Sequence, residues 1–174
     1  MSIQILIVDY DPHWPELFAL QASRIRSALG RRALGIEHVG PTSVPGLAAK
    51  PVIDLLLAVA DSAKEDAYAP SLEAAGYVLR IREPQWNQHR LFKGPDVDIN
   101  LHVFSSSCPE IDRMIIFRDW LRGNAADRDL YARTKLALAQ KEWAEVQHYA
   151  DAKTAIVDEI LARARAHQLP ADHG

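Results

Sequence analysis

Two segments with strand-like composition carry the residues best suited to acid or metal chemistry. Asp54 is the single charge in the apolar run of residues 52–59, and Asp98 and His102 belong to the alternating segment DVDINLHVF. An ionised carboxylate in an apolar strand is costly unless it is paired or bound to a metal. Residues two apart on a strand lie roughly 6.5–7 Å apart, so acids on this face can approach one divalent cation directly or through water.

The sequence leaves a structural explanation open for each of these residues. Asp54 is also explained as a structural carboxylate that caps a helix or pairs with an arginine. Asp96 lies next to a turn and is also explained as a solvated acid. A lone histidine such as His102 is more often a hydrogen-bonded structural group than a ligand or a base. The polar row formed with Asn100 favours the functional interpretation of His102.

A loop rich in glycine and proline precedes residues 52–59 and has the parts needed to hold phosphates. In GPTSVPGLAAK, Gly40 permits close approach of the backbone, Thr42 and Ser43 offer hydroxyls, and Lys50 supplies a positive charge. The spacing differs from that of a P-loop, and the chain has no G-x-G-x-x-G motif after a strand. The alternative is a rigid turn with a solvated lysine.

Basic residues elsewhere allow the same two explanations. Arg90 lies in or beside two predicted strands with three other basic residues, Arg80, Arg82 and Lys93. This group forms either a patch that faces phosphate or a charged sheet edge. Arg118 and Arg122 are one helical turn apart, as are Tyr131 and Lys135, and such pairs grip an anion or tie helices together. We expect no catalytic role for Cys108 and no zinc site, because the chain lacks a cysteine pair and an H-E-x-x-H motif.

The pattern of apolar and turn residues predicts an α/β or α+β domain. We expect one unit over residues 1–174, with an α/β core at about 1–105 and a helical part at about 109–168. The predicted strands are 3–8, 36–39, 52–59, 77–82, 88–92 and 96–104. The predicted helices are 13–29, 62–75, 109–121, 127–149 and 151–167.

Composition limits the classes of protein and partner. The 174 residues are 48% hydrophobic and 25% charged, which is typical of a soluble globular protein. The net charge of −3 makes a nucleic-acid partner unlikely. With one cysteine, a start MSIQILIVDY unlike a signal peptide and no apolar run of about 20 residues, we expect a cytoplasmic protein without a membrane segment.

Several separated motifs in the right order resemble the GrpB (UPF0157) family over nearly the whole chain. They are IVDYDPHWPELF, IEHVGPTSVPGLAAKPVIDLLLAV, INLHVF, FRDWLR and YADAKTAIV, together with Tyr131 and Lys135. This family is similar to the nucleotidyltransferase fold, so the resemblance implies a mixed sheet flanked by helices, with a helical C-terminal extension. In some bacteria a related domain is joined to dephospho-coenzyme A kinase, which implies nucleotide or coenzyme metabolism.

The resemblance also implies a catalytic arrangement. Val39 and Gly40 match the start of the nucleotidyltransferase signature, and Asp54 matches its first strand carboxylate. Asp54 and Asp98 (or Asp96) would hold Mg²⁺, and His102 would position the substrate or act as a base. The phosphates of an NTP would lie against Gly40, Thr42, Ser43, Lys50 and Arg90 while a nucleotidyl group is transferred to a small acceptor.

Two departures from that signature favour an alternative without catalysis. Pro41 stands where the family usually has a serine, which removes a hydroxyl and a backbone N–H from the phosphate side. Leu56 stands where the second carboxylate of the signature is expected. The alternative function is therefore a module that binds a nucleotide or a ligand related to coenzyme A and has lost transferase activity.

Overall fold

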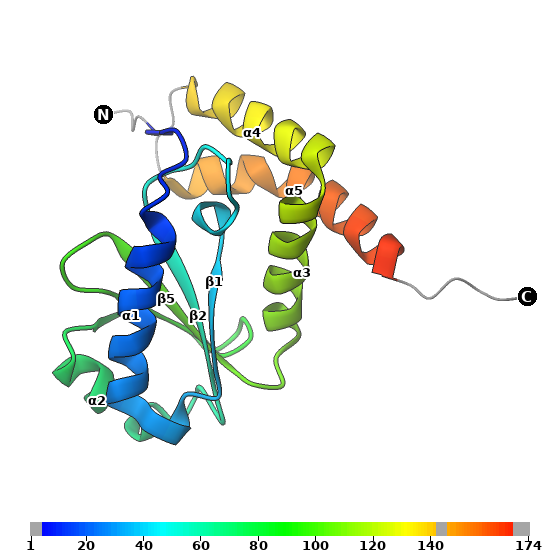
Figure 1. The fold of residues 1–174 in the computed structure, drawn as a ribbon. Coiled ribbons are helices and arrows are strands. Elements are labelled where there is room, and N and C mark those ends of the chain that lie inside the picture. Colours follow the sequence, from blue (N-terminus) through cyan, green and yellow to red (C-terminus); the bar gives the residue numbers. More distant parts are fainter. Residues whose placement is uncertain (1–4, 142–145, 169–174) are drawn as a thin grey trace, which may run out of the picture.

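A computed structural model describes residues 5–141 and 146–168 of the chain. Five strands and five α-helices follow one another in a mixed order (Figure 1). The strands are β1 (Gly35–Val39), β2 (Ile53–Val59), β3 (Val78–Glu83), β4 (His89–Lys93) and β5 (Ile99–Ser105). The helices are α1 (Trp14–Leu29), α2 (Ala69–Ala74), α3 (Pro109–Gly123), α4 (Ala125–Ala139) and α5 (Val146–Gln168), with short 3₁₀ turns η1 (Gly30–Arg32), η2 (Pro41–Ser43) and η3 (Glu65–Ala67).

The strands form one mixed sheet in the order β1-β2-β5-β4-β3. β2 and β5 are parallel neighbours at its centre, and every other pairing is antiparallel. The register places Asp54 beside Asn100 and Leu56 beside His102. Polar side chains that the sequence separates by more than 40 residues therefore lie on one face of neighbouring strands.

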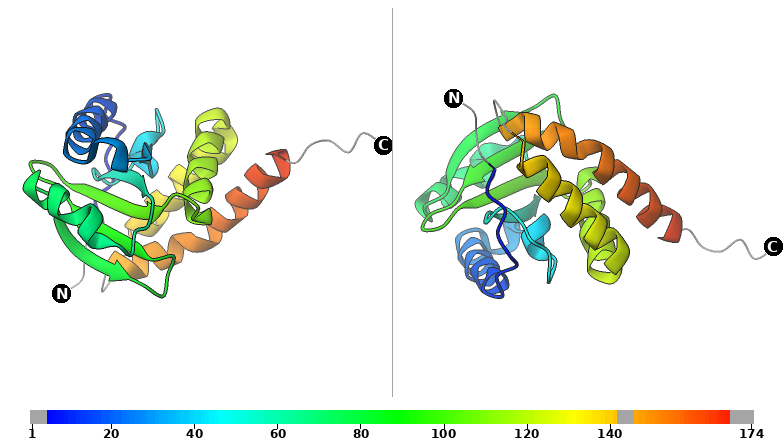
Figure 2. Two further views of the ribbon diagram at one scale, coloured as in Figure 1. Left: turned by 90° about the horizontal axis from the view of Figure 1, so that it is seen from below. Right: turned by 90° about the horizontal axis from the view of Figure 1, so that it is seen from above.

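The two faces of the sheet have different coverings. Leu55 and Leu57 of β2 and Leu101 of β5 point into the main core, which α1 and α2 close. On the opposite face, Leu56 and Phe104 pack against the first turns of α3. Figure 2 shows α1 on one side of the sheet and the group α3–α5 on the other. β2 is therefore buried from both sides, as its run of aliphatic residues predicts.

A separate apolar cluster joins the C-terminal helices to the loop between β1 and β2. Val44 and Leu47 of this loop pack with Leu121 of α3, Tyr131 of α4 and Ile160 of α5. In Figure 1, α4 and α5 cross over the end of the sheet at which β1 ends and β2 begins. This arrangement brings the glycine-bearing loop, the first residues of β2 and two helices together.

The sequence-based predictions are confirmed for the mixed α/β class and for most elements. Residues 13–29, 36–39, 52–59 and 109–121 correspond to α1, β1, β2 and α3. Asp11 lies just before α1 and accepts a hydrogen bond from the His13 backbone N–H (2.8 Å). No helix in the described part of the chain is long and apolar enough to cross a membrane.

Four predictions of elements were wrong. β5 begins at Ile99, so Asp96 and Asp98 precede the strand and only Asn100 and His102 belong to its polar face. Asp96 has a φ of 74°, a turn conformation that the alternation of apolar residues does not reveal.

The other three errors concern the lengths of two helices and an expected first strand. The predicted helix 62–75 is a 3₁₀ turn followed by the short α2, and the predicted helix 127–149 ends at Ala139, so Tyr149 belongs to α5. Of the predicted strand 3–8, the described residues contribute one bridge between Val8 and Ala49, and residues 3 and 4 lie outside the described part. Tertiary packing decides such boundaries more strongly than local pattern.

Candidate functional site

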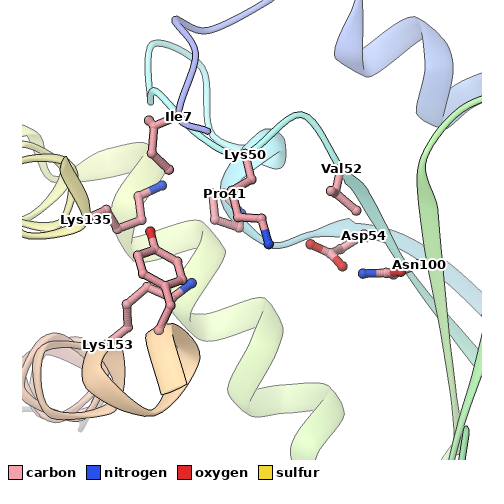
Figure 3. A pocket seen from close by; sticks show the side chains of 9 residues that line it. Ile7, Pro41, Lys50, Val52, Asp54, Asn100, Lys135 and Lys153 are labelled. Atoms are coloured by element: carbon pink, nitrogen blue, oxygen red, sulfur yellow. The ribbon is translucent and has the colours of Figure 1, made fainter. Parts of the chain in front are cut away.

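A solvent-open cavity of about 120 Å³ lies where β2, β5, α4 and α5 meet. In Figure 3, Lys135 and Lys153 approach from the helices, Lys50 from the loop, and Asp54 and Asn100 from the sheet on the opposite side. The lining also contains Ile7, Pro41, Val52 and Tyr149. The cavity thus combines three cationic side chains with one carboxylate and one amide.

Lys135 is the most buried of the three lysines, with 1% of its surface exposed. Its Nζ donates a hydrogen bond to the Ala48 carbonyl oxygen (2.8 Å) and lies 4.7 Å from the centre of the Tyr131 ring. Burial, together with the nearby charge of Lys153, lowers the pKa of Lys135 to about 7. Keeping the Lys135 amine charged therefore costs free energy, and an anion bound in the cavity would offset this cost.

Lys153 and Lys50 complete the cationic side. Lys153 lies over the Tyr149 ring, with 4.8 Å between its Nζ and the ring centre. Burial lowers the pKa of Lys153 and the charge of Lys50 lowers it further, while Asp54 opposes both effects. Among the described residues, no salt bridge involves Lys50, Lys135 or Lys153.

Gly40 allows close approach of the backbone, as the loop sequence predicts, but the group that it approaches is the Asp54 carboxylate. Its φ is 72°, and a Cβ at this position would lie 2.6 Å from the Asp54 Oδ2 atom. Glycine therefore allows the loop to pass close to Asp54, and a larger residue would displace the carboxylate. Pro41, the next residue, forms part of the cavity wall.

Thr42 and Ser43 are buried within the loop and do not line the cavity. Thr42 Oγ1 donates to the Val52 carbonyl oxygen (3.3 Å) and lies 2.9 Å from His38 Nε2, while the Ser43 hydroxyl donates to the Gly40 carbonyl oxygen. Because the Thr42 proton is used, His38 Nε2 donates in that contact. Burial and the charge of Arg122 lower the pKa of His38 to about 4, so its ring is neutral.

Asp54 and His102 are brought together by the structure. His102 Nε2 lies 3.1 Å from Asp54 Oδ1, and His102 Nδ1 lies 3.0 Å from His89 Nε2. His89 Nδ1 in turn lies 2.8 Å from Glu83 Oε1. His102 is not part of the cavity wall, so it reaches the cavity through Asp54.

Asp98 and Arg90 lie away from the cavity. The Asp98 carboxylate accepts a hydrogen bond from Lys93 Nζ, which also donates to Asn100 Oδ1 (2.7 Å). Arg90 is buried at the far side of the sheet, where its Nε donates to Glu65 Oε2 (2.6 Å). Asp98 and Arg90 thus have partners within the chain.

These residues fit a resident magnesium ion poorly. Mg²⁺ in proteins is held by oxygen ligands, usually carboxylates, with water and substrate phosphates completing the octahedron. The cavity wall offers the Asp54 carboxylate and the Asn100 amide, facing three lysines. In the described part of the chain, no group of three or more histidine, cysteine or acidic residues is placed to hold a metal. The donor set suits an anion better than a cation.

Sequence reasoning did not identify Lys153 and Tyr149 as cavity residues, and it left open whether Tyr131 and Lys135 grip an anion or tie helices together. One signal was present, because Tyr131 and Lys135 in α4 and Tyr149 and Lys153 in α5 share the same spacing of four residues. This spacing places each amine over a ring on the same helical face. The convergence of the two faces on one cavity depends on the crossing of α4 and α5, which no local pattern encodes.

Known proteins are similar to this chain over almost its whole length. A protein described as UPF0157 protein BH1888, from Halalkalibacterium halodurans, is 65% identical over 165 residues, which cover 95% of this chain and 85% of that protein. The crystal structure of conserved protein GrpB from Enterococcus faecalis matches with a TM-score of 0.78 and 32% identity, covering 93% of this chain and 98% of that one.

Some of the more distant relatives are larger. A protein named dephospho-CoA kinase, from Mycolicibacterium paratuberculosis, is 27% identical over 86% of this chain, which spans 43% of that protein. The family model described as GrpB protein matches residues 4–163. The chain therefore belongs to the GrpB family.

Proposed function

We propose that this chain binds a small molecule through its phosphate groups in the lysine cavity. The observation that carries the proposal is the convergence of Lys50, Lys135 and Lys153 on one cavity without a salt bridge among the described residues. Buried cations are costly unless an opposite charge accompanies them, and here a ligand would supply it. Phosphate is suited to this role because each of its oxygens accepts charge-assisted hydrogen bonds.

The size of the cavity indicates which part of a ligand it takes. Its volume of about 120 Å³ is small, whereas sites that enclose a whole drug-sized ligand have roughly 300–1,000 Å³. We therefore expect the phosphate end to enter and the remainder to lie outside. The distant relatives named dephospho-CoA kinase support nucleotides and coenzyme A precursors as the ligand class.

Calorimetric titration with inorganic pyrophosphate at pH 6.5 tests this proposal, since pyrophosphate presents phosphate groups alone. We expect binding by the unmodified protein and a roughly 10–100-fold loss in Lys135→Met and in Lys153→Met, because a hydrogen bond to a charged group contributes about 1.5–3 kcal/mol. Methionine keeps the unbranched side chain as far as Cε and removes the charged amine.

Lys64→Met is the matched control, because Lys64 is exposed and lines a different cavity beside Asp61 and Tyr68. This variant has the same change in net charge and should bind pyrophosphate as the unmodified protein does. Equal losses in Lys64→Met and Lys135→Met would show that net charge alone attracts the anion. Failure of the unmodified protein to bind pyrophosphate, ATP and dephospho-coenzyme A would overturn the proposal.

Transfer of a nucleotidyl group from an NTP to a small acceptor is the second candidate. It is favoured by the position of Asp54, whose carboxylate lies on the cavity wall opposite the lysines, where a base could take the proton of an attacking hydroxyl. Magnesium enters this candidate as the companion ion of the nucleotide phosphates. Label transfer from an NTP that is lost with EDTA and in Asp54→Asn supports it, and transfer unchanged in Asp54→Asn contradicts it.

Two further predictions accompany the proposed ligand. A cytoplasmic location follows from the sequence-based analysis, and a nucleic-acid partner is disfavoured by the net charge of −3. Fractionation of cells that produce the tagged protein tests the first. Titration with a mixed-sequence duplex at 150 mM salt tests the second, for which we expect no binding.

A further inference from the structure

Four ionisable side chains cross the sheet in a continuous hydrogen-bonded line. Each comes from a different strand, and the four strands are neighbours: Glu83 from β3, His89 from β4, His102 from β5 and Asp54 from β2. The three contacts are 2.8 Å, 3.0 Å and 3.1 Å long. One end of the line, Asp54, lies on the lysine cavity, and the other, Glu83, lies on the outermost strand.

The number of protons in this line follows from its geometry. Each of the three hydrogen bonds needs one proton between its two heavy atoms. Two ionised carboxylates carry none, and two neutral imidazoles carry one each. With only these two protons, one contact would place two acceptors face to face. The line of Glu83, His89, His102 and Asp54 therefore holds three protons, one more than two ionised carboxylates and two neutral imidazoles carry.

The surroundings of His89 make a positive charge on its ring costly. His89 has 6% of its side chain exposed and packs against the rings of Trp86 and Phe104. Burial lowers the pKa of His89, and the hydrogen bond that His89 donates to Glu83 opposes that effect. Arg90 and His102 also disfavour a charge on His89. An extra proton on His89 is therefore held at a cost, which its hydrogen bond to Glu83 partly offsets.

The surroundings of Asp54 differ, because charged and titratable groups face it from several elements. They are Lys50 of the loop, His38 of β1, Tyr131 and Lys135 of α4, and Lys153 of α5. The positive charges of the lysines attract the Asp54 carboxylate. An anion in the cavity would engage the lysines and repel the Asp54 carboxylate.

We propose that Glu83, His89, His102 and Asp54 form a proton relay that neutralises Asp54 when a phosphate-bearing ligand enters the cavity. In the free protein, His89 donates from both nitrogens, to Glu83 and to His102, and His102 Nε2 donates to Asp54. On binding, the proton on His89 Nε2 moves to His102 Nδ1, and the proton on His102 Nε2 moves to Asp54 Oδ1. Three protons and three hydrogen bonds are present before and after.

The shift removes the negative charge from the cavity wall without taking a proton from solvent. The net charge of the line stays at one negative unit, which remains on Glu83, a side chain that is 37% exposed. His89 and Glu83 are thus positioning residues, which act on the ligand through His102 and Asp54. This coupling rests on the proposed binding of phosphate groups, whereas the extra proton is a property of the free protein.

Glu83→Gln separates the relay from an ordinary hydrogen-bonded network. The glutamine amide can donate to His89 Nδ1, so all three contacts are kept with two neutral imidazoles and no extra proton. Glu16→Gln is the matched control, because Glu16 is exposed at the start of α1 and its carboxylate has no hydrogen bond or salt bridge in the described part of the chain. Both variants keep the size of the side chain and lose one negative charge.

Nitrogen-15 spectra of histidine-labelled protein, titrated with pH and assigned with His89→Gln and His102→Gln, provide the first test. We expect the ring nitrogens of His89 and His102 in the unmodified protein and in Glu16→Gln to show one positive charge, held by His89, at pH 5.5. The midpoint at which this charge is lost should fall by roughly 1 pH unit or more in Glu83→Gln. Equal midpoints in all three proteins, or two neutral rings in the unmodified protein, would overturn the relay.

Addition of inorganic pyrophosphate at pH 5.5 provides the second test. The ring nitrogens should move to the neutral form while the carbon-13 signal of the Asp54 carboxyl moves to the protonated form. Binding of pyrophosphate without these shifts would overturn the coupling and leave the proposed function standing. Absence of binding would overturn the proposed function together with the coupling, and the titration of the free protein would still decide whether the line holds the extra proton.

Discussion

Two clusters of basic residues lie in different parts of the molecule, and they differ in whether the chain supplies the opposite charge. Arg82 and Arg90 both donate to the Glu65 carboxylate, at 2.8 Å and 2.6 Å. Lys135 and Lys153, by contrast, point into a cavity with no salt bridge among the described residues. The first cluster is internally neutralised, and the second is open to an anion from outside.

The pKa values separate the clusters in the same way. Hydrogen bonds from Arg82 and Arg90 outweigh burial and hold the pKa of Glu65 below its ordinary value. In the cavity, burial lowers the pKa of Lys135 to about 7. A pair matched within the chain stabilises the fold in its charged form, whereas an unmatched buried amine stabilises it only when an anion binds. The comparison therefore predicts opposite effects for variants of the two clusters.

Glu65→Gln should have the largest effect on the free energy of unfolding. It leaves Arg90, which has 6% of its side chain exposed, without its carboxylate. Breaking a buried pair costs about 3–5 kcal/mol, and Glu65 is partly exposed, so we expect a loss of about 3 kcal/mol in urea denaturation. Pyrophosphate affinity should not change. A loss as small as that of the control Glu16→Gln would show that the arginine cluster is not structural.

Gly40→Ala should have the next largest effect and should act on both stability and binding. The added Cβ meets the Asp54 Oδ2 atom at 2.6 Å, and the φ of 72° is unfavourable for alanine. Strain of this kind costs about 1–3 kcal/mol, so we expect a loss of about 2 kcal/mol in denaturation, together with weaker pyrophosphate binding. Gly46→Ala is the control, since its φ is 81° but its Cβ would meet no atom within 4 Å. Equal pyrophosphate affinities in the two variants would contradict the role of Gly40 beside Asp54.

Sequence alone predicted the parts of the site that depend on local pattern. Asp54 and Lys50 were identified as candidate site residues because a charge in an apolar strand and a lysine after a glycine loop are unusual, and both line the cavity. The mixed sheet and α1 were predicted from periodicity and from turn residues. The family resemblance added the fold, and the match to GrpB from Enterococcus faecalis bears it out.

The rest of the site depends on contacts between distant segments. Asp98 was grouped with His102 by alternation, but the strand begins after Asp98, whose carboxylate pairs with Lys93. Arg90 was assigned to phosphate, yet Glu65, 25 residues away, neutralises it. The lysines of α4 and α5 reach the cavity through helix packing. Such pairings are set by tertiary structure and have no signature in composition or spacing.

The lysine cluster should also make the free energy of unfolding depend on pH. The pKa of Lys135 is about 7 in the folded protein and 10.5 in its ordinary state. Between these values the unfolded chain binds a proton that the folded protein lacks, so the free energy of unfolding rises with pH, by at most about 1.4 kcal/mol per unit. Urea denaturation from pH 7 to 9 should show this slope in the unmodified protein and in Lys64→Met. The slope should be shallower in Lys135→Met, and equal slopes would contradict a neutralised Lys135.

Asp54→Asn should have the smallest effect and tests the one negative charge in the cavity. Two unit charges 4 Å apart interact by about 1 kcal/mol in water, so removing the carboxylate should tighten pyrophosphate binding by about fivefold. Asp98→Asn is the control, since Asp98 is exposed and pairs with Lys93 outside the cavity. Weaker binding in Asp54→Asn than in Asp98→Asn would contradict the comparison, because Asp54 would then hold the ligand rather than repel it.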